Sequence, residues 1–160
     1  MREIPLTRGL VALVDDADYE MLSRFRWFSQ PKEYTAYALR NETANGRQTT
    51  KRMHRMIMLP GPEQHVDHIN GDGLDNRRSN LRLCTHGQNM RNGRPRSGAR
   101  SQFKGVDWDK QHRKWRARVT RDSGQRLHVG FFDTESEAAN AYDVAATEAY
   151  GEFARINVAG

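Results

Sequence analysis

The chain has 160 residues, and its 26 Lys and Arg against 20 Asp and Glu give a formal charge of +6. This length fits one ordinary domain or two small ones, and a hydrophobic fraction of 36% allows only a modest core. No apolar run is long enough to span a membrane, and the N-terminus lacks a secretory h-region, so we expect an intracellular protein without membrane contact. The single cysteine, Cys84, excludes an internal disulfide and cysteine-based zinc knuckles.

The first fifty residues have the pattern of a β-rich scaffold. Residues 10–14 are a short apolar run typical of a strand, and the apolar spacing over 18–28 predicts a short helix that leads into another strand. Residues 34–39 are a strand candidate, and Asn45-Gly46 is a strong hairpin signal that joins them to residues 48–53. We interpret this whole region as scaffold.

A strand–loop–strand–helix order is predicted from residue 65 to residue 89. Residues 65–69 and 81–83 have strand patterns, and the loop between them is dense in Gly, Asn and Asp. The T-x-x-Q form at Thr85 predicts a helix that starts there. We interpret His54 as structural and Asn76 as a loop-stabilising residue.

This order could bring the first strand and the helix together around a cation. Asp67 and Asn89 would then share a hard ion through oxygen ligands, which suits Mg²⁺. His68 projects to the opposite side of a regular strand, so a bulge or the strand end must re-aim one of the two neighbours. A histidine beside a metal-bound phosphate can deprotonate a water, because its ordinary pKa lies near neutrality.

These residues resemble the HNH endonucleases with a ββα-metal fold, especially the phage and intron-encoded homing type. The matching motifs are residues 66–72, 75–77, 79–82 and 88–89, with 53–57 upstream. The resemblance implies that His68 is the general base and that Asn80 orients it through a hydrogen bond. It also implies that Asp67 and Asn89 hold one divalent ion, Mg²⁺ or alternatively Mn²⁺, with no structural zinc. Asn89 stands where many relatives have their second histidine.

Basic residues gather in the middle of the chain. From Arg77 to Lys104 there are eight basic residues and no acidic residue. Clustered Lys and Arg neutralise phosphates, so we favour a polyanion footprint over a merely solvated face. Residues 92–101 are rich in Gly, Pro and Ser as well as Arg, and we interpret them as a basic linker.

The last sixty residues predict three strands and a helix. The strand candidates are 103–108, 115–119 and 127–132, and the capping box at Thr134 starts a helix that should end near Gly151. Alternation in the second strand places Arg116 and Arg118 on the face opposite Trp115, Ala117 and Val119. Such a basic sheet face can enter a major groove.

This region resembles the ethylene-response-factor (Apetala-type) DNA-binding domain of plants, which is also found fused to phage homing endonucleases. The matching residues are 103–106, 114–117, 129–134, 137–139, 141–143, 145–146, Gly151 and Asn157. The resemblance implies DNA contacts from Arg116, Arg118 and Trp108. Asp107 stands where the plant domains usually have arginine, so their target sequence is not carried over.

The sequence therefore predicts an α+β protein with a nuclease domain at 1–91 (ββα-metal core about 54–91), a linker at 92–101 and a DNA-binding domain at 102–160. We expect a monomeric endonuclease that binds double-stranded DNA in a bacterial or phage-infected cell. The alternatives are a non-catalytic DNA-binding regulator that keeps the nuclease frame, and an RNA-binding protein. The residues expected to contact DNA are Arg77, Arg91, Arg94, Arg96, Arg100, Lys104, Trp108, Arg113, Lys114, Arg116, Arg118 and Arg121.

Overall fold

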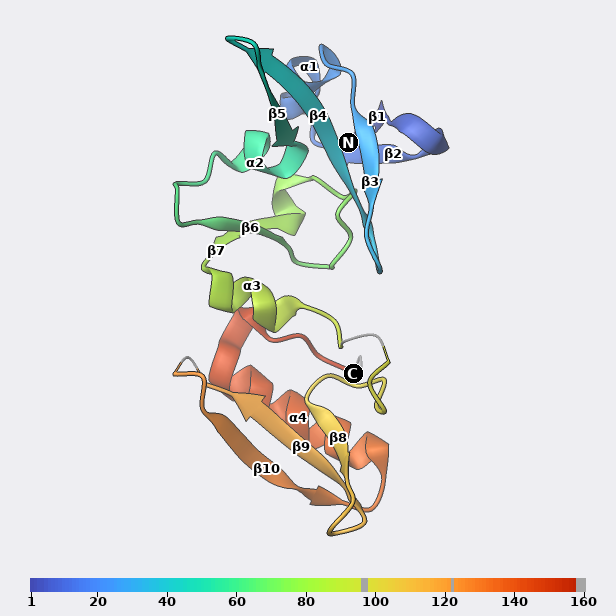
Figure 1. Cartoon of the computed structure of the whole chain (residues 1–160), viewed down its shortest axis with the longest axis vertical. Coiled ribbons are helices and arrows are strands. Elements are labelled where there is room, and N and C mark those ends of the chain that lie inside the picture. Colours follow the sequence, from blue (N-terminus) through green and yellow to red (C-terminus); the bar gives the residue numbers. More distant parts are fainter. Residues whose placement is uncertain (96–97, 122, 158–160) are drawn as a thin grey trace. The chain divides into compact units, whose positions relative to one another are not determined.

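The computed structural model describes residues 1–95, 98–121 and 123–157, and the chain divides into two compact units, Met1–His86 and Gly87–Gly160 (Figure 1). Each unit has its own hydrophobic core, and the mixture of helices with antiparallel sheets confirms the α+β class. The domain limits at 91 and 102 stay predictions. No helix within the described ranges has the length and apolar character needed to cross a membrane.

The first unit consists of short antiparallel pairings and small helices. Its strands are β1 (Arg2–Pro5), β2 (Val11–Val14), β3 (Phe28–Pro31), β4 (Ala36–Ala44), β5 (Arg47–Arg52), β6 (His65–His68) and β7 (Leu81–Cys84). Its helices are α1 (Asp16–Ser23) and α2 (Met53–Met58), with 3₁₀ turns η1 (Thr7–Gly9) and η2 (Arg78–Asn80). The strands form three separate sheets, β1–β2, β3–β4–β5 and β6–β7.

Local signals explain much of this unit. The hairpin between β4 and β5 turns at Asn45 and Gly46, both with positive φ, as the Asn-Gly signal predicted. The prediction that the strand after this turn reaches Met53 is wrong, because Met53 is the first residue of α2. Met53 and Ile57 are both buried one helical turn apart, so core contacts select helix at this point.

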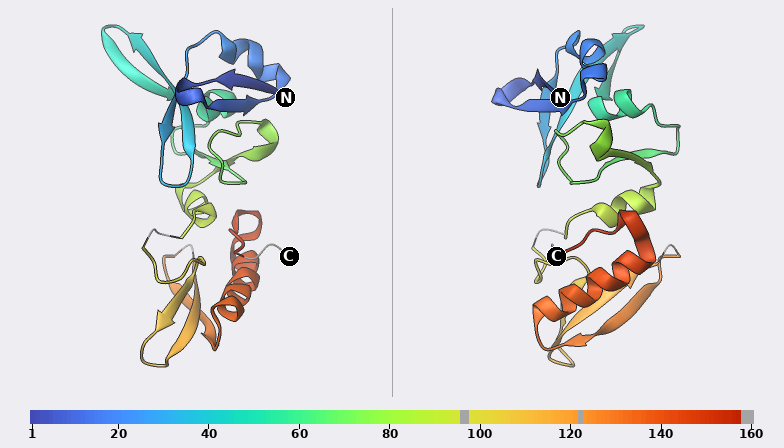
Figure 2. Two further views of the ribbon diagram at one scale, coloured as in Figure 1. Left: turned by 90° about the vertical axis from the view of Figure 1, so that its right-hand side faces the viewer. Right: turned by 180° about the vertical axis from the view of Figure 1, so that it is seen from behind.

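The second unit is a sheet covered by one helix (Figure 2). Its elements are α3 (His86–Asn92), β8 (Val106–Asp109), β9 (Lys114–Thr120), β10 (Arg126–Phe132), α4 (Glu135–Tyr150) and the 3₁₀ turn η3 (Gly151–Phe153), of which α3 begins at the last residue of the first unit. The sheet is antiparallel in the order β10–β9–β8. The predicted helix start is confirmed by a complete capping box between Thr134 and Glu137.

Small side chains set the distance between α4 and the sheet. Ala138, Ala139 and Ala146 are fully buried against Ala117 and Val119, and Tyr142 fills the rest of this core. Because alanines present little volume, the helix backbone can approach the strands closely. The core is correspondingly small and sensitive to added volume.

We expect Gly105→Ala to destabilise the second unit by about 3 kcal/mol, because of overpacking and positive φ. Gly105 has φ +73°, and an added Cβ would lie 2.1 Å from the ring of Tyr142. Gly124→Ala is the matched control, because Gly124 also has positive φ but has no atom within 4 Å of such a Cβ. Hydrogen exchange of β9 and α4 peptides measures the loss. Equal losses in the two variants would contradict the packing explanation.

Candidate functional site

The pairing of β6 with β7 positions two adjacent polar side chains in the first unit. Asp67 lies opposite Arg82 and His68 lies opposite Leu81 in a regular antiparallel register. Asp67 and His68 are only 6% and 5% exposed. Because His68 is the last residue of β6, the strand end rather than a bulge sets the direction of its side chain.

Aromatic rings surround His68. The His54 ring of α2 lies 5.0 Å from the His68 ring at a right angle, and the Tyr37 ring of β4 lies 5.7 Å away. Burial lowers the pKa of His68, an effect that Asn76 and the nearby carboxylate of Asp67 partly oppose. His68 is therefore neutral at neutral pH, which is the form that can accept a proton.

His54 of α2 packs against the ring of His68. Burial is the main cause that lowers its pKa to about 3, and the nearby His68, Arg52 and Arg55 add to the effect. An imidazole that stays uncharged can pack edge-on against a second imidazole without charge repulsion. This packing agrees with the structural interpretation of His54.

The loop after β6 is held by side chains rather than by strand pairing. Asn80 accepts a hydrogen bond from the Asn70 amide at 3.0 Å and donates to the Asp75 carbonyl at 2.8 Å. The backbone of Asn80 also accepts from the Ile69 amide, so the residues that follow His68 are fixed to η2. These bonds position His68 through its own loop, and a direct bond from Asn80 to His68 stays a prediction.

A second group of contacts ties the same loop to the rest of the unit. Asp75 receives two 2.7 Å hydrogen bonds from Arg77, which lowers the pKa of this carboxyl. Asn76 donates to the Leu74 carbonyl at 3.1 Å, and its backbone pairs with Leu13 of β2. Asn76 is therefore a loop-stabilising residue, as interpreted, and it also faces His68. The DNA contact predicted for Arg77 would compete with its bonds to Asp75.

The carboxylate of Asp67 is shared with a residue that the sequence reasoning missed. Arg82 donates to Asp67 Oδ2 from Nε at 2.9 Å and from Nη2 at 2.7 Å, and the Asp67 carboxylate is buried while the Arg82 side chain is 11% exposed. The register of β6 and β7 places Arg82 directly opposite Asp67. An antiparallel pairing of these two strands could have indicated the ion pair from the sequence. Burial, with Asp67 nearby, also raises the pKa of Cys84 to about 11, so its thiol stays protonated.

The predicted ligands have the donor types that a hard cation prefers, but one of them, Asp67, is already bonded to Arg82. Asp67 supplies a buried carboxylate and Asn89 of α3 an amide oxygen, which are ligand types that Mg²⁺ accepts. Arg82 already bonds to Asp67, so an ion must share this carboxylate. Among the residues that the structure describes, no group of three or more His, Cys, Asp or Glu could hold a metal. Asn89 belongs to the second unit, and its pairing with Asp67 stays a prediction.

The outer face of the second unit carries the predicted arginines, but it is not purely basic. Arg116 donates to Asp107 and Asp109 at 2.6 Å each, and Arg118 donates to Asp107 at 2.9 Å. The expected concentration of uncompensated positive charge on this face therefore needs correction. Trp108 lies opposite Trp115, on the face that packs toward α4, and its ring contacts Trp115 edge-on. Its DNA contact stays a prediction.

Other predicted DNA-binding residues have varied surroundings. The Lys104 ammonium donates to the carbonyls of Met90, Arg91 and Gly93, so it caps the end of α3. The Arg91 guanidinium stacks 4.8 Å from the Tyr150 ring, and Lys114 pairs with Asp133 at 3.1 Å. The exposed members are Arg94, Arg100, Arg113 and Arg121, and Arg96 lies outside the described residues.

Two family models match the chain. The HNH endonuclease model matches residues 58–91, which include β6, β7 and most of α3, and the AP2 domain model matches residues 101–152. The chain contains an HNH endonuclease domain followed by an AP2 domain. Both resemblances drawn from the motifs are thus confirmed.

Similar proteins match either most of the chain or a part of it. An uncharacterized HNH endonuclease, L560, of Acanthamoeba polyphaga mimivirus is 29% identical over 94% of this chain and 76% of its own length. Protein 3.8 of Escherichia phage T7 is 32% identical over 57% of this chain and 74% of its own length. The AP2-like ethylene-responsive transcription factor CRL5 of rice is 48% identical over 32% of this chain, which spans only 8% of that protein.

The stability of the HNH unit should fall as the pH drops below about 6.5. The pKa of His54 is about 3 in the folded protein against 6.5 ordinarily, so between these values only the unfolded chain binds the proton. Each pH unit in this window costs about 1.4 kcal/mol. Hydrogen exchange of α2 and β6 peptides at several pH values measures the slope. His54→Gln should reduce it, and an unchanged slope would contradict the assignment to His54.

In the AP2 domain, Asp107→Asn should strengthen non-specific DNA binding and make it more salt-dependent. The substitution removes the carboxylate that pairs with Arg118 and one of the two carboxylates that pair with Arg116. The guanidinium groups can then contact DNA phosphates whatever the base sequence. Duplex DNA affinity measured against salt concentration checks this, with Glu148→Gln on the exposed side of α4 as a control of equal charge. Identical salt slopes for both variants would contradict a role of Asp107 in neutralising Arg116 and Arg118.

Proposed function

We propose that this chain is a metal-dependent endonuclease of the homing type that hydrolyses phosphodiester bonds in double-stranded DNA. The observation that carries the proposal is the buried, neutral imidazole of His68 beside the buried carboxylate of Asp67, within a region that matches the HNH endonucleases. The AP2 domain would supply affinity and sequence preference. A bacterial or phage-infected cell is the proposed setting.

The residues of the chain divide the chemical work. His68 would accept the proton of the attacking water, and the loop held by Asn80 would keep its ring in place. Asp67 and Asn89 would hold one Mg²⁺, or Mn²⁺, with Arg82 fixing the carboxylate. When bound, this ion stabilises the charge that develops on the phosphate and on the leaving oxygen. As the family resemblance implies, the ends would be 5′-phosphate and 3′-hydroxyl.

DNA contacts are proposed for both units. The set is the one expected from the sequence. Several of its members already have contacts within the protein that DNA binding would replace or leave in place, namely Arg77, Arg91, Lys104, Trp108, Lys114, Arg116 and Arg118. Arg116 and Arg118 would reach base edges, while Arg113, Lys114 and Arg121 would contact phosphates. We propose a monomer.

Purified protein with Mg²⁺ or Mn²⁺ should cut a genomic DNA pool, and His68→Ala should lower the rate by about 10²–10⁴-fold, the usual worth of a positioned general base. DNA binding by the same variant should be unchanged, because the substitution of His68 leaves the AP2 sheet intact. Gel analysis of cut DNA and a binding titration give both values. Equal cutting by wild type and His68→Ala would refute the assignment.

The ion pair between Asp67 and Arg82 specifically favours a second function, a DNA-binding regulator without catalysis. The partly buried Arg82 bonds to the proposed ligand carboxylate where a cation would bind and neutralises its charge. This function predicts DNA binding with no cutting at any divalent ion concentration. Arg82→Gln separates the two proposals, because it should lower metal-dependent cutting if Arg82 fixes the ligand carboxylate, whereas the regulator function predicts no cutting by either protein.

A further inference from the structure

The β4–β5 hairpin has features that a scaffold does not need. All six residues of β5, from Arg47 to Arg52, are exposed, and the hairpin tip extends beyond the remainder of the first unit (Figure 2, left). In β4 the buried residues are Ala38 and Leu39, near its start, while Asn41 and the residues after it are largely exposed. A ribbon exposed on both faces contributes little to a core.

Positive charge is concentrated on this hairpin and the helix that follows. Between residues 40 and 55 there are five basic residues and one acidic residue, a net charge of +4 within a chain of +6. The basic residues are Arg40, Arg47, Lys51, Arg52 and Arg55. Such a charge on an exposed ribbon is what a phosphate backbone attracts.

The strand register divides the ribbon into two different faces. Residues directly opposite in an antiparallel pair share a face. One face, the Glu42 face, carries Arg40, Glu42, Ala44, Arg47, Thr49 and Lys51. There Glu42 pairs with Arg40 at 2.5 Å and with Lys51 at 3.4 Å, so its single carboxylate is shared by two of the three basic residues and the face keeps a net charge of +2.

The other face, the Gln48 face, has no carboxylate at any position. It carries Asn41, Thr43, Gln48, Thr50 and Arg52, all within the described part of the chain. Amide and hydroxyl side chains are the groups that bond base edges in a major groove. Thr50 and Asn41 already bond to each other at 3.2 Å, which fixes their orientation.

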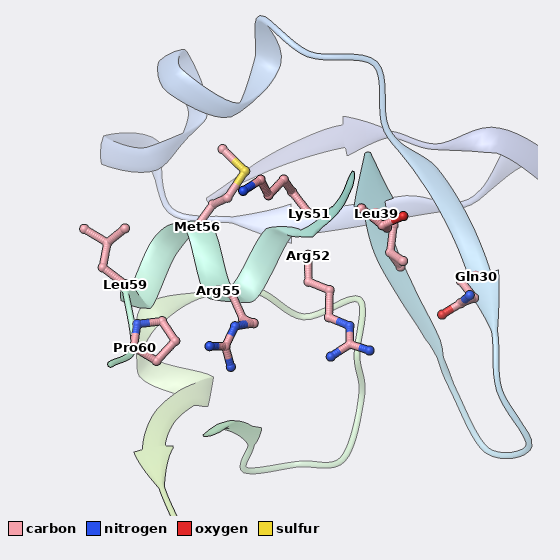
Figure 3. A pocket seen from close by; sticks show the side chains of 9 residues that line it. Gln30, Leu39, Lys51, Arg52, Arg55, Met56, Leu59 and Pro60 are labelled. Atoms are coloured by element: carbon pink, nitrogen blue, oxygen red, sulfur yellow. The ribbon is translucent and has the colours of Figure 1, made fainter. Parts of the chain in front are cut away.

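The Gln48 face leads toward the proposed catalytic histidine. A pocket of about 820 Å³ continues it, lined by Gln30, Leu39, Arg52 and Arg55 among others (Figure 3). In Figure 3 the Arg52 and Arg55 side chains project to one side, while Lys51 and Met56 project to the other. The same two arginines are close enough to lower the pKa of His54, whose ring contacts His68.

Tyr37 gives an independent connection between the same two regions. Tyr37 precedes Leu39 by two residues on β4 and lies opposite Gln30 of β3, so it shares the Gln48 face. Its ring lies 5.7 Å from the His68 ring. A duplex that lies along this face would therefore pass from the hairpin tip to His68.

We propose that the β4–β5 ribbon is a second DNA-reading element, which enters a major groove with its Gln48 face toward the bases and brings the scissile phosphate to His68. Five residue steps of about 3.4 Å separate Arg47 from Arg52, about 17 Å along the strand. Arg52 lies on the Gln48 face and Arg47 lies near the hairpin tip on the Glu42 face. Because their separation along the strand exceeds the width of a major groove, about 12 Å, their long side chains can reach phosphates at its two edges from the two ends of the ribbon. The inference rests on the proposed endonuclease function and adds a recognition element inside the nuclease unit.

The test measures duplex DNA binding by the full chain carrying His68→Ala, so that cutting does not interfere. Arg47→Gln with Arg52→Gln should lower the slope of log affinity against log salt by about 1.8, because each lost phosphate contact removes about 0.9. The matched control is Arg8→Gln with Arg24→Gln, which removes the same charge from exposed positions of the same unit. It should leave the slope within about 0.3 of the parent value. Equal slopes for the two pairs would overturn the proposal.

A second variant tests base reading with His68 intact. Gln48→Ala with Thr50→Ala should relax the sequence preference of cut sites about tenfold at a few neighbouring base pairs, with the salt slope unchanged. An identical set of cut sites would overturn the reading role of the Gln48 face. If the wild type binds but never cuts, the endonuclease proposal fails. The binding result then decides on the ribbon alone.

Discussion

Burial of Asp67 and His68 at the end of a four-residue strand is the constraint on which the first unit depends. A buried carboxylate needs a compensating charge, and β7 supplies Arg82 directly across the strand pair. A buried imidazole needs neutral, closely packed neighbours, and α2 and β4 supply His54 and Tyr37. The elements of this unit therefore pack together around two polar side chains that are buried away from solvent.

The loop after His68 shows what such burial requires of the backbone. Its amides and carbonyls lie beside a buried site and need partners. Asn80, Asp75 and Asn76 provide them from within the loop, and Leu13 of β2 completes the set. Asn80, which was expected to orient His68 directly, holds the loop that follows His68. The proposed chemistry and the local stability share the same bonds.

Local signals made much of the fold predictable. The Asn45-Gly46 turn, the β6 and β7 patterns and the capping box at Thr134 each depend on a few neighbouring residues, and each is confirmed. Contacts between distant residues were not predictable in the same way. Lys104 reaches carbonyls 11 to 14 residues earlier, and the charge of Asp107 changes the role of arginines on another strand.

Averaged charge also concealed a feature. Counting over long blocks placed the basic region after Arg77, because acidic loops at 63–75 balance the basic residues of the β4–β5 hairpin. Once the chain is folded, the hairpin carries four basic residues and one acidic residue, a net charge of +3, and all of β5 is exposed. The AP2 sheet shows the opposite case, since carboxylates of β8 compensate arginines of β9. Placement on elements, rather than total charge, indicates where a phosphate backbone can bind.

In the proposed mechanism the His68 imidazole takes the proton from the attacking water. Chemical rescue measures this most directly, with His68→Gly supplied with free imidazole on bound duplex DNA and a divalent ion. We expect almost no cutting without imidazole and a rate that rises with the concentration of neutral imidazole until the vacated space is filled. Cutting by His68→Gly at the wild-type rate without any imidazole would contradict it.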